Sequence, residues 1–384
     1  MSQNRQHQPQ HQGLQDSKDR HFEIDLLRGV ACAAVVAFHF LYRGQQDAWI
    51  TDQAPAALAQ VARYGYLGVY LFFIISGYVI FKSAQGATVR AFVASRFARL
   101  YPAYWVAVCF TAGLAWALSS VTFGVSLRDF LINLTMLMHW LPPTFGVALV
   151  DGAYWSLAVE FQFYLMIALV LWTGTLARIE TLLTGWLLLS IADFVRRAYL
   201  PEVWLALEWA PLFSAGILFH QIRHEGLTRQ RYLLLWCCYM VALAHATIPA
   251  ELLKGSADGS SRSAWVVAGA MTLFFAVFGL ISADRWHLRG SALVKWVGAL
   301  TYPVYLVHQN VGYLLLEFWK PTGLAFGVRL AAVLAVVLLV SLMIHRWVER
   351  PLGPRLRRWM DPVPKWRGRS GARPAARPRR VAVA

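Results

Sequence analysis

Two ionisable residues lie on one face of an apolar segment near the start of the chain. Arg28 and His39 are eleven residues apart in the stretch LRGVACAAVVAFHF. At 100° per residue of helix they return to within about 20° of the same face, roughly 16 Å apart along the axis. A neutral histidine can accept a proton from a hydroxyl group, and an arginine at the rim of the segment can hold an anion. The pattern indicates a site for proton transfer, although a buried histidine bonded to a neighbouring helix would fit it too.

Two further arginines lie close together in the stretch VASRFARLYPAYW. Arg96 and Arg99 are three residues apart and are expected on one side of a helix at the membrane boundary, where two guanidinium groups would clamp a phosphate. Pro102 is expected near the start of the following span, where proline costs little. Asp25, three residues before Arg28, is expected to pair with that arginine. Anchoring to lipid headgroups is the alternative for the arginine pair.

A carboxylate interrupts the apolar stretch DGAYWSLAVEFQFYLM. Glu160 lies about one and a half turns into the expected span. An ionisable group at that depth is costly and usually has a function. It could orient His39, accept a hydrogen bond from a sugar hydroxyl, or exchange a proton. A structural hydrogen bond to another helix is the alternative.

A polar stripe is expected in the stretch VGALTYPVYLVHQN. Tyr302, Tyr305 and His308 follow one another at intervals of three residues, so they share a face that is expected to point inward. Pro303 is expected to kink this helix. For the two tyrosines an interfacial aromatic belt is the alternative, which fits His308 poorly.

The stretch RYGYLGVYLFFIISGYVIF combines small and bulky residues. Gly65, Gly68 and Gly77, together with Ser76, are expected to let neighbouring helices or a ligand approach the backbone closely.

Positioning all these residues requires membrane helices. The chain of 384 residues is 58% hydrophobic and 15% charged, far more apolar than a soluble domain. Its apolar residues fall into ten stretches, each long enough to cross a bilayer core about 30 Å thick. The expected fold is therefore all-α, a polytopic membrane protein with about ten transmembrane helices. The expected spans are 24–42, 64–81, 101–120, 155–174, 181–199, 203–220, 232–250, 264–282, 293–317 and 326–346.

The distribution of lysine and arginine sets the expected orientation, because short loops rich in them stay cytoplasmic. The segments 82–99, 221–231 and 283–295 carry such residues and fall on one side, together with both termini if the number of spans is even. This N-in, C-in arrangement divides the chain into a disordered cytoplasmic tail (1–22), a transmembrane domain (23–347) and a basic cytoplasmic tail (348–384). The polar N-terminal segment does not resemble a cleaved signal peptide. The net charge of +16 fits anionic membrane lipids rather than nucleic acid.

The four cysteines all lie inside expected spans, where they should pack as small apolar residues. They are Cys32, Cys109, Cys237 and Cys238. No disulfide framework and no metal site is expected.

Taken together, these stretches resemble the acyltransferase 3 family of membrane O-acyltransferases, which modify sugars, glycopolymers and some small molecules. The stretch IDLLRGVACAAVVAFHF looks like that family's first-helix signature. GVYLFFIISGYVI, RFARLYPAY, WSLAVEFQFY, LTYPVYLVH and ERP follow in the family's order, so the resemblance covers nearly all of residues 22–351. Tyr70 departs from the pattern because many members carry a carboxylate there, and Thr301 replaces a common serine.

The resemblance implies roles for several residues. His39 would be the catalytic histidine, as general base or as covalent acyl carrier, and Glu160 an important acidic residue. Arg28, Arg96 and Arg99 would bind the acyl-CoA donor. Trp155, Tyr302 and His308 are our own candidates for binding the acceptor and do not come from the resemblance.

The implied function is transfer of an acyl group, acetyl by default, from acyl-CoA to a hydroxyl of a cell-surface or lipid-linked glycan. Acyl-CoA would be a co-substrate rather than a permanently bound cofactor, and the expected location is the inner (cytoplasmic) membrane. A homo-oligomer is compatible with the sequence. The alternatives are an acyltransferase with a small-molecule acceptor and a transporter or flippase of a small molecule or lipid-linked sugar. The two halves of the chain show no internal similarity, which many transporters have.

Overall fold

The computed structural model describes residues 21–120, 122–141, 143–196, 205–252 and 261–362. Within these ranges the regular elements are helices and no strand occurs, so the all-α expectation is confirmed. Nearly all of the expected N-terminal tail and most of the expected C-terminal tail lie outside the described residues.

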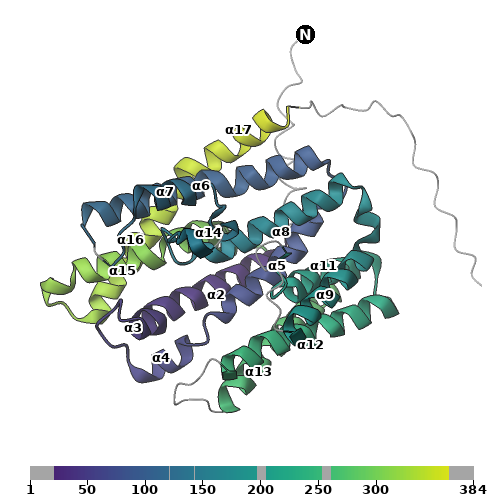
Figure 1. Cartoon of the computed structure of the whole chain (residues 1–384), viewed down its shortest axis with the longest axis horizontal. Coiled ribbons are helices and arrows are strands. Elements are labelled where there is room, and N and C mark those ends of the chain that lie inside the picture. Colours follow the sequence, from purple (N-terminus) through teal and green to yellow (C-terminus); the bar gives the residue numbers. More distant parts are fainter. Residues whose placement is uncertain (1–20, 121, 142, 197–204, 253–260, 363–384) are drawn as a thin grey trace, which may run out of the picture.

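The longer helices form one bundle (Figure 1). They are α2 (Phe22–Phe38), α5 (Leu67–Ala84), α6 (Val89–Ala117), α8 (Tyr154–Trp172), α9 (Ile179–Arg196), α11 (Ala210–Glu225), α12 (Arg229–Leu252), α13 (Ser261–Ser282), α14 (Ala292–Val307), α15 (Gln309–Phe318), α16 (Phe326–Ile344) and α17 (Arg350–Met360). Short elements connect them: η1 (His39–Arg43), α3 (Gly44–Gln46), α4 (Ala56–Ala62), α7 (Leu127–Asn133), η2 (Met138–Trp140), η3 (Pro143–Phe145), η4 (Thr175–Arg178), η5 (Lys320–Thr322) and η6 (His345–Glu349).

Seven helical stretches of the described residues are long and apolar enough to cross a membrane. They are Phe22–Gln46, Ala56–Ala84, Val89–Ala117, Tyr154–Trp172, Thr175–Val195, Ala264–Ser282 and Phe326–Met360. Each of the other expected spans also overlaps a helix, α11, α12 or the α14–α15 pair. The total of ten spans and the N-in, C-in orientation stay predictions.

The structure corrects the expected position of Pro102. The segment 82–99 is not a loop, because α5 runs to Ala84 and α6 already begins at Val89. The Thr88 hydroxyl caps this helix by accepting a hydrogen bond from the Ala91 N–H group at 3.2 Å. Pro102 therefore lies inside α6 rather than near its start, and it has no N–H group to donate to the carbonyl of Ala98 one turn earlier.

The structure also corrects the start of the C-terminal tail. The chain does not become a tail at residue 348 but continues through η6 into α17, which packs along α6 (Figure 1). Arg90 of α6 donates from Nε to the carbonyl oxygen of Met360, at a distance of 2.6 Å. A Cβ atom on Gly353 would lie 3.3 Å from the Ala98 carbonyl oxygen. The helix α17 thus packs over the carbonyl that Pro102 leaves without its usual partner.

The expected span 293–317 consists of two helices that meet at His308, while Pro303 stays inside α14. The buried carboxylate of Asp151 accepts a hydrogen bond from the Asn310 N–H group at 2.9 Å, in the first turn of α15. An acceptor at this position satisfies one of the free N–H groups of a helix N-terminus. Asp151 therefore stabilises the start of α15 immediately after His308.

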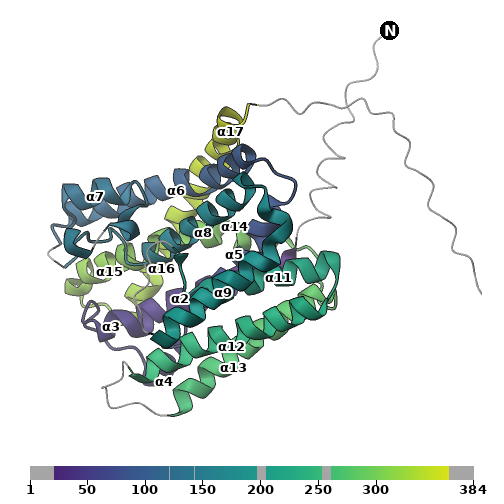
Figure 2. The same cartoon turned by 45° about the vertical axis from the view of Figure 1, so that its right-hand side comes forward.

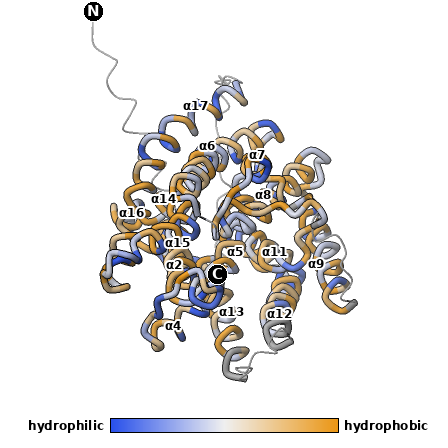
Figure 3. The backbone as a smooth tube through the Cα atoms, turned by 60° about the vertical axis from the view of Figure 1, so that its left-hand side comes forward, coloured by the Kyte–Doolittle hydropathy of each residue, from blue (hydrophilic) through white to orange (hydrophobic). Residues whose placement is uncertain are grey.

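Close backbone contacts hold α5 in the centre of the bundle, next to α2, α8 and α11. A Cβ atom on Gly77 would lie 2.1 Å from the Phe213 carbonyl oxygen in α11, and one on Gly68 would lie 2.4 Å from the Ala31 carbonyl oxygen in α2. The expectation that these glycines allow close approach is confirmed. Figure 2 shows α12 and α13 side by side on the outer side of α11. Apolar residues predominate along most helices, whereas hydrophilic residues gather at several helix ends and on α17 (Figure 3).

Candidate active site

His39 and His308 meet in the interior of the bundle. The distance from His39 Nδ1 to His308 Nε2 is 2.9 Å, and that from His308 Nδ1 to the carbonyl oxygen of Tyr305 is 2.8 Å. His308 is fully buried, whereas His39 is partly exposed. The sequence predicted both histidines on inward faces, and the structure joins them directly although they are 269 residues apart.

These contacts determine which ring nitrogens carry hydrogen when both rings are neutral. A carbonyl oxygen can only accept, so His308 donates from Nδ1 to Tyr305 and its Nε2 atom is an acceptor. His39 then donates from Nδ1 to His308. The other nitrogen of His39, Nε2, keeps its lone pair and has no hydrogen-bond partner among the described residues. The arrangement presents a base at His39 whose tautomer is set by a second group, as in a catalytic triad.

The backbone around His39 departs from a regular α-helix. His39 is the first residue of the π-helix η1, a conformation that is rare and often occurs at functional sites. The Tyr313 hydroxyl of α15 donates to the His39 carbonyl oxygen at 3.1 Å. Because Asp151 stabilises the start of α15, the same helix helps to hold both histidines.

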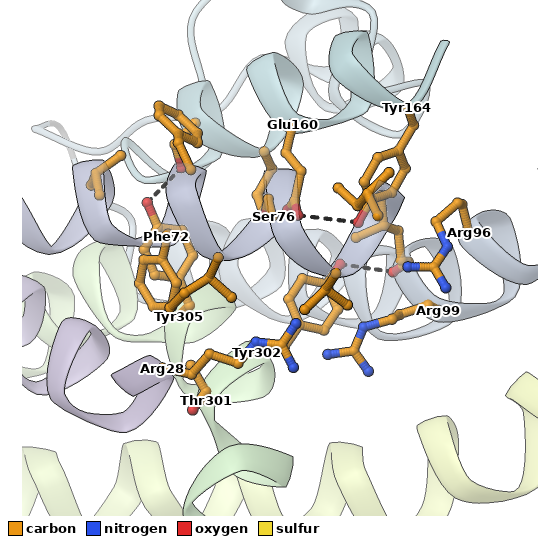
Figure 4. A pocket seen from close by; sticks show the side chains of 18 of the residues that line it. Arg28, Phe72, Ser76, Arg96, Arg99, Glu160, Tyr164, Thr301, Tyr302 and Tyr305 are labelled. Atoms are coloured by element: carbon orange, nitrogen blue, oxygen red, sulfur yellow. Dashed lines mark hydrogen bonds between the residues drawn. The ribbon is translucent and has the colours of Figure 1, made fainter. Parts of the chain in front are cut away.

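A cavity lies between α2, α5, α6, α8 and α14 (Figure 4), and neither His39 nor His308 is among its lining residues. Its polar lining residues are Arg28, Ser76, Arg96, Arg99, Ser156, Glu160, Tyr164, Thr301, Tyr302 and Tyr305. At one end the Tyr305 ring lies 5.4 Å from the His308 ring, centroid to centroid, and its hydroxyl is 2.6 Å from that of Ser156. Arg96 and Arg99 lie towards the other end, and Arg28 lies between them and Tyr305 (Figure 4).

Arg28, Arg96 and Arg99 all line the cavity, and their role in donor binding stays a prediction. Arg96 donates to the Ser95 hydroxyl at 3.0 Å, but its Nε atom is buried without a hydrogen-bond partner. Arg99 is exposed and makes no hydrogen bond or ion pair with another described residue. Asp25 attracts Arg28 electrostatically. This end of the cavity therefore holds cationic donors that an anion can use.

Glu160 lies with the arginines and not with the histidines. Its Oε1 atom accepts hydrogen bonds from the Ser76 hydroxyl at 2.6 Å and from the Tyr164 hydroxyl at 3.1 Å. Its charge also attracts Arg28 and Arg96. Of the roles considered from sequence, the orientation of His39 is filled by His308 instead.

The residues expected to bind the acceptor occupy three different environments. Tyr302 lines the cavity, and its hydroxyl donates to the Leu100 carbonyl oxygen at 2.9 Å. Trp155 packs between Phe73 and Trp209 and is not among the residues that line the cavity. His308 is buried behind His39. The structure thus favours an orienting role for His308 over direct contact with an acceptor.

A groove continues from the arginine end of the cavity to the surface. Arg28, Arg96, Arg99 and Gly298 line both, and the groove adds residues of η6 and α17. The added basic residues are His345, Arg350, Arg357 and Arg358. Sequence reasoning missed the three arginines because it assigned them to a tail. Their spacing, which places them on one face of a helix, was the signal that could have found them.

Comparisons with known proteins identify the family of the chain. A family model described as an acyltransferase domain, acyltransferase 3, matches residues 21–346. Acyltransferase MdmB of Streptomyces mycarofaciens is 28% identical over 366 residues, which cover 85% of this chain and 89% of that protein. The putative membrane-bound transacylase BcsY of Komagataeibacter xylinus is 27% identical, over 87% of this chain and 83% of its own length. Peptidoglycan O-acetyltransferase OatA of Listeria monocytogenes is 24% identical, over 86% of this chain and 55% of its own length.

No solved structure matches the chain. The family model covers most of the sequence, and the relatives carry acyltransferase names. The chain therefore belongs to the acyltransferase 3 family and is a multi-pass membrane acyltransferase that transfers groups other than aminoacyl groups.

Proposed function

We propose that this protein transfers an acyl group, by default acetyl, from acyl-CoA to a hydroxyl of a cell-surface or lipid-linked glycan, with His39 as the general base. The observation that carries the proposal is the hydrogen-bond chain from His39 through His308 to the Tyr305 carbonyl, which leaves His39 Nε2 free to accept a proton. Family membership supports the reaction class.

The donor enters at the arginine end. Its phosphates are bound by Arg28, Arg96 and Arg99, whose guanidinium groups line both the groove and the cavity. The pantetheine arm then extends through the cavity towards Tyr305. Arg28 and His39 are separated by about 16 Å along α2, a distance that an extended arm of this kind can cover.

The chemical step needs one base and no further co-reactant. His39 Nε2 removes the proton of the acceptor hydroxyl as its oxygen attacks the thioester carbonyl carbon. The carbon–sulfur bond then breaks, and the protonated His39 returns the proton to the departing thiolate. The products are the ester and free CoA. His308 keeps the reactive nitrogen of His39 unprotonated before the step and disperses the positive charge during it.

In this scheme Glu160 helps to position the acyl-CoA donor. It holds the hydroxyls of Ser76 and Tyr164 and balances part of the arginine charge. Trp155 and Tyr302 remain candidates for acceptor binding.

A glycan acceptor is supported by one relative whose name specifies O-acetylation of peptidoglycan. The inner membrane is the proposed location, because acyl-CoA is a cytoplasmic metabolite and the basic segments fit the cytoplasmic side. An acceptor on the outer side or within the bilayer would reach His39 from the end of the bundle opposite the arginines.

The proposal is tested by measuring CoA release from acetyl-CoA by purified protein, with and without an extract of the host's lipid-linked glycans. We expect release to require both the extract and His39, so that His39→Ala lowers the rate to background while thermal stability is unchanged. Mass spectrometry of the extract then identifies the acceptor, and a modified small molecule would replace the glycan in this scheme. Full activity of His39→Ala would remove this residue from the mechanism, and no release from acetyl-, succinyl- or longer acyl-CoA by folded wild-type protein would contradict the proposed function.

A further inference from the structure

The helix α17 presents one face to the basic groove. The groove-lining residues of the helix are Arg350, Gly353, Pro354, Arg357 and Arg358, and Asp361 follows directly after it. Their spacing follows the helical repeat, so they form a stripe roughly 16 Å long. Leu352 and Trp359 are exposed and are not among the groove residues. The helix therefore separates a basic face towards the groove from exposed apolar side chains elsewhere.

The position of this face is fixed by contacts with α6. Arg90 Nε donates to the Met360 carbonyl oxygen near the end of α17, and Gly353 lies over the Ala98 carbonyl. These contacts bring the arginines of α17 into the same groove as Arg96 and Arg99 of α6. Two segments that are about 250 residues apart in the chain thus form the walls of one basic groove.

The charge of the groove is only partly balanced within the protein. Six arginines line it, against the three carboxylates of Asp25, Glu349 and Asp361. The Glu349 carboxylate is bonded to His345 Nδ1 at 2.7 Å. Arg350 and Arg357 make no hydrogen bond or ion pair with another described residue, and Arg358 donates only to the Pro354 carbonyl oxygen at 3.3 Å. Several guanidinium groups that face one groove without acidic partners suit a ligand with more than one phosphate.

We propose that α17 forms the second wall of the donor site and that Arg357 and Arg358, with Arg350, bind the phosphates of the donor's nucleotide. This inference rests on the proposed use of acyl-CoA. Arg96 and Arg99 then bind from the opposite wall, and Arg28 lies where the pantetheine arm enters the cavity. The nucleotide of CoA carries a diphosphate and a separate 3′-phosphate, so it offers two anionic groups to the two walls.

Phosphate of the same chemistry is also present in anionic lipid headgroups, and Arg355 allows the two sources to be separated. Arg355 is an exposed arginine of the same helix that does not line the groove. Binding to a lipid surface would depend on Arg355 about as much as on Arg357, because headgroup attraction follows local charge rather than groove geometry. Binding of the donor would depend on Arg357 and Arg358 and not on Arg355.

The test compares acetyl-CoA with acetyl-pantetheine, which carries the same thioester but no phosphate. Full-length wild type, the double variant Arg357→Ala/Arg358→Ala and the control Arg355→Ala are assayed in nanodiscs of phosphatidylcholine alone and with added phosphatidylglycerol. In neutral nanodiscs we expect the KM for acetyl-CoA to rise about tenfold in the double variant. We also expect an unchanged KM for acetyl-pantetheine and wild-type behaviour of Arg355→Ala.

Each other result has a defined meaning. An unchanged KM for acetyl-CoA in the double variant, or an equal rise for both donors, would overturn the inference. An effect seen only with phosphatidylglycerol and shared by Arg355→Ala would assign the arginines to lipid and also overturn it. If wild type used neither donor, the proposed function itself would fail, whereas failure of this inference alone leaves wild type active with acetyl-CoA. Arg357→Lys serves as a second variant, because it keeps the charge and loses the planar donor group.

Discussion

The arginine groove and the histidine pair differ in whether their polar side chains have partners within the protein. In the groove, several arginines are exposed and lack acidic partners, so the region is prepared for a charged ligand. At the other end of the cavity, His308 is fully buried and each histidine has a defined hydrogen-bond partner. A charged group is costly inside a membrane protein, whereas a neutral imidazole with a satisfied N–H group is not. The comparison suggests that binding of anionic phosphates and proton transfer are kept in separate places.

Apart from loss of the base itself in His39→Ala, the largest predicted effect concerns His308, because it sets the tautomer of His39 without touching the donor. His308→Ala should lower kcat about 100-fold and leave the KM for acetyl-CoA near that of wild type. His308→Gln is the matched variant, since its side-chain oxygen can accept the His39 Nδ1 hydrogen, and it should recover part of the loss. Initial rates at varied donor concentration check this. Wild-type kcat in His308→Ala would show that the histidine pair is structural.

The next largest effect should appear in donor binding. Arg96→Ala and Arg99→Ala should each raise the KM for acetyl-CoA about tenfold, because each removes a charge-assisted hydrogen-bond donor. The maximal rate should change much less than in the His308 variant. Arg128→Ala is the control, since Arg128 donates to the Phe145 carbonyl oxygen at 2.6 Å outside the cavity and groove. CoA affinity measured by isothermal titration provides an independent check, and unchanged affinity in both variants would remove the arginine pair from the donor site.

A smaller effect is expected for Glu160→Gln. The amide keeps an oxygen that can accept from Ser76 and Tyr164, so kcat should fall by less than about tenfold. Because Glu160 is not bonded to His39, the pH profile of kcat should keep the shape of the wild-type profile. Loss of one limb of that profile would instead make Glu160 a proton-transfer partner. Proton transfer would then not be confined to the histidine pair.

The smallest effect concerns the support of the histidine end by Asp151. This residue precedes the span Tyr154–Trp172, and its complete burial raises the pKa of its carboxyl to about 7. A raised pKa means that the folded state binds the proton more tightly, so this group's stabilisation is present at low pH and is lost as pH rises from about 4 to about 7. The thermal midpoint of wild type should therefore fall by a few degrees more than that of Asp151→Asn over this range. Equal slopes for the two proteins would contradict this account.

The sequence was sufficient to predict the helical class, the two histidines and the arginines of α2 and α6, but not how they combine. His39 and His308 were recognised separately because each is an ionisable group in an apolar stretch. Their contact depends on the packing of α2 against α14 and on the break between α14 and α15, which the periodicity of neither segment reveals. For the same reason orientation of His39 was one of the roles left open for Glu160, whereas packing of α5 against α8 brings this residue to Ser76.

The C-terminal segment was misjudged for a different physical reason. A strongly basic composition is typical of a solvated tail. Pro351 lies in the first turn of α17, where the missing N–H group costs little. Contacts with α6 stabilise the rest of the helix, and tertiary contacts of this kind are not encoded in local propensity.

Single-turnover transfer of a labelled acetyl group tests most directly the claim that His39 is the general base. Wild type and His39→Ala are mixed with saturating labelled acetyl-CoA and acceptor, and the labelled ester is quantified over time beside the CoA affinity of each protein. Our account predicts that His39→Ala binds CoA as wild type does and forms no ester above background at any donor concentration. Ester formation by His39→Ala at a rate close to that of wild type would contradict the assignment of His39 as the base.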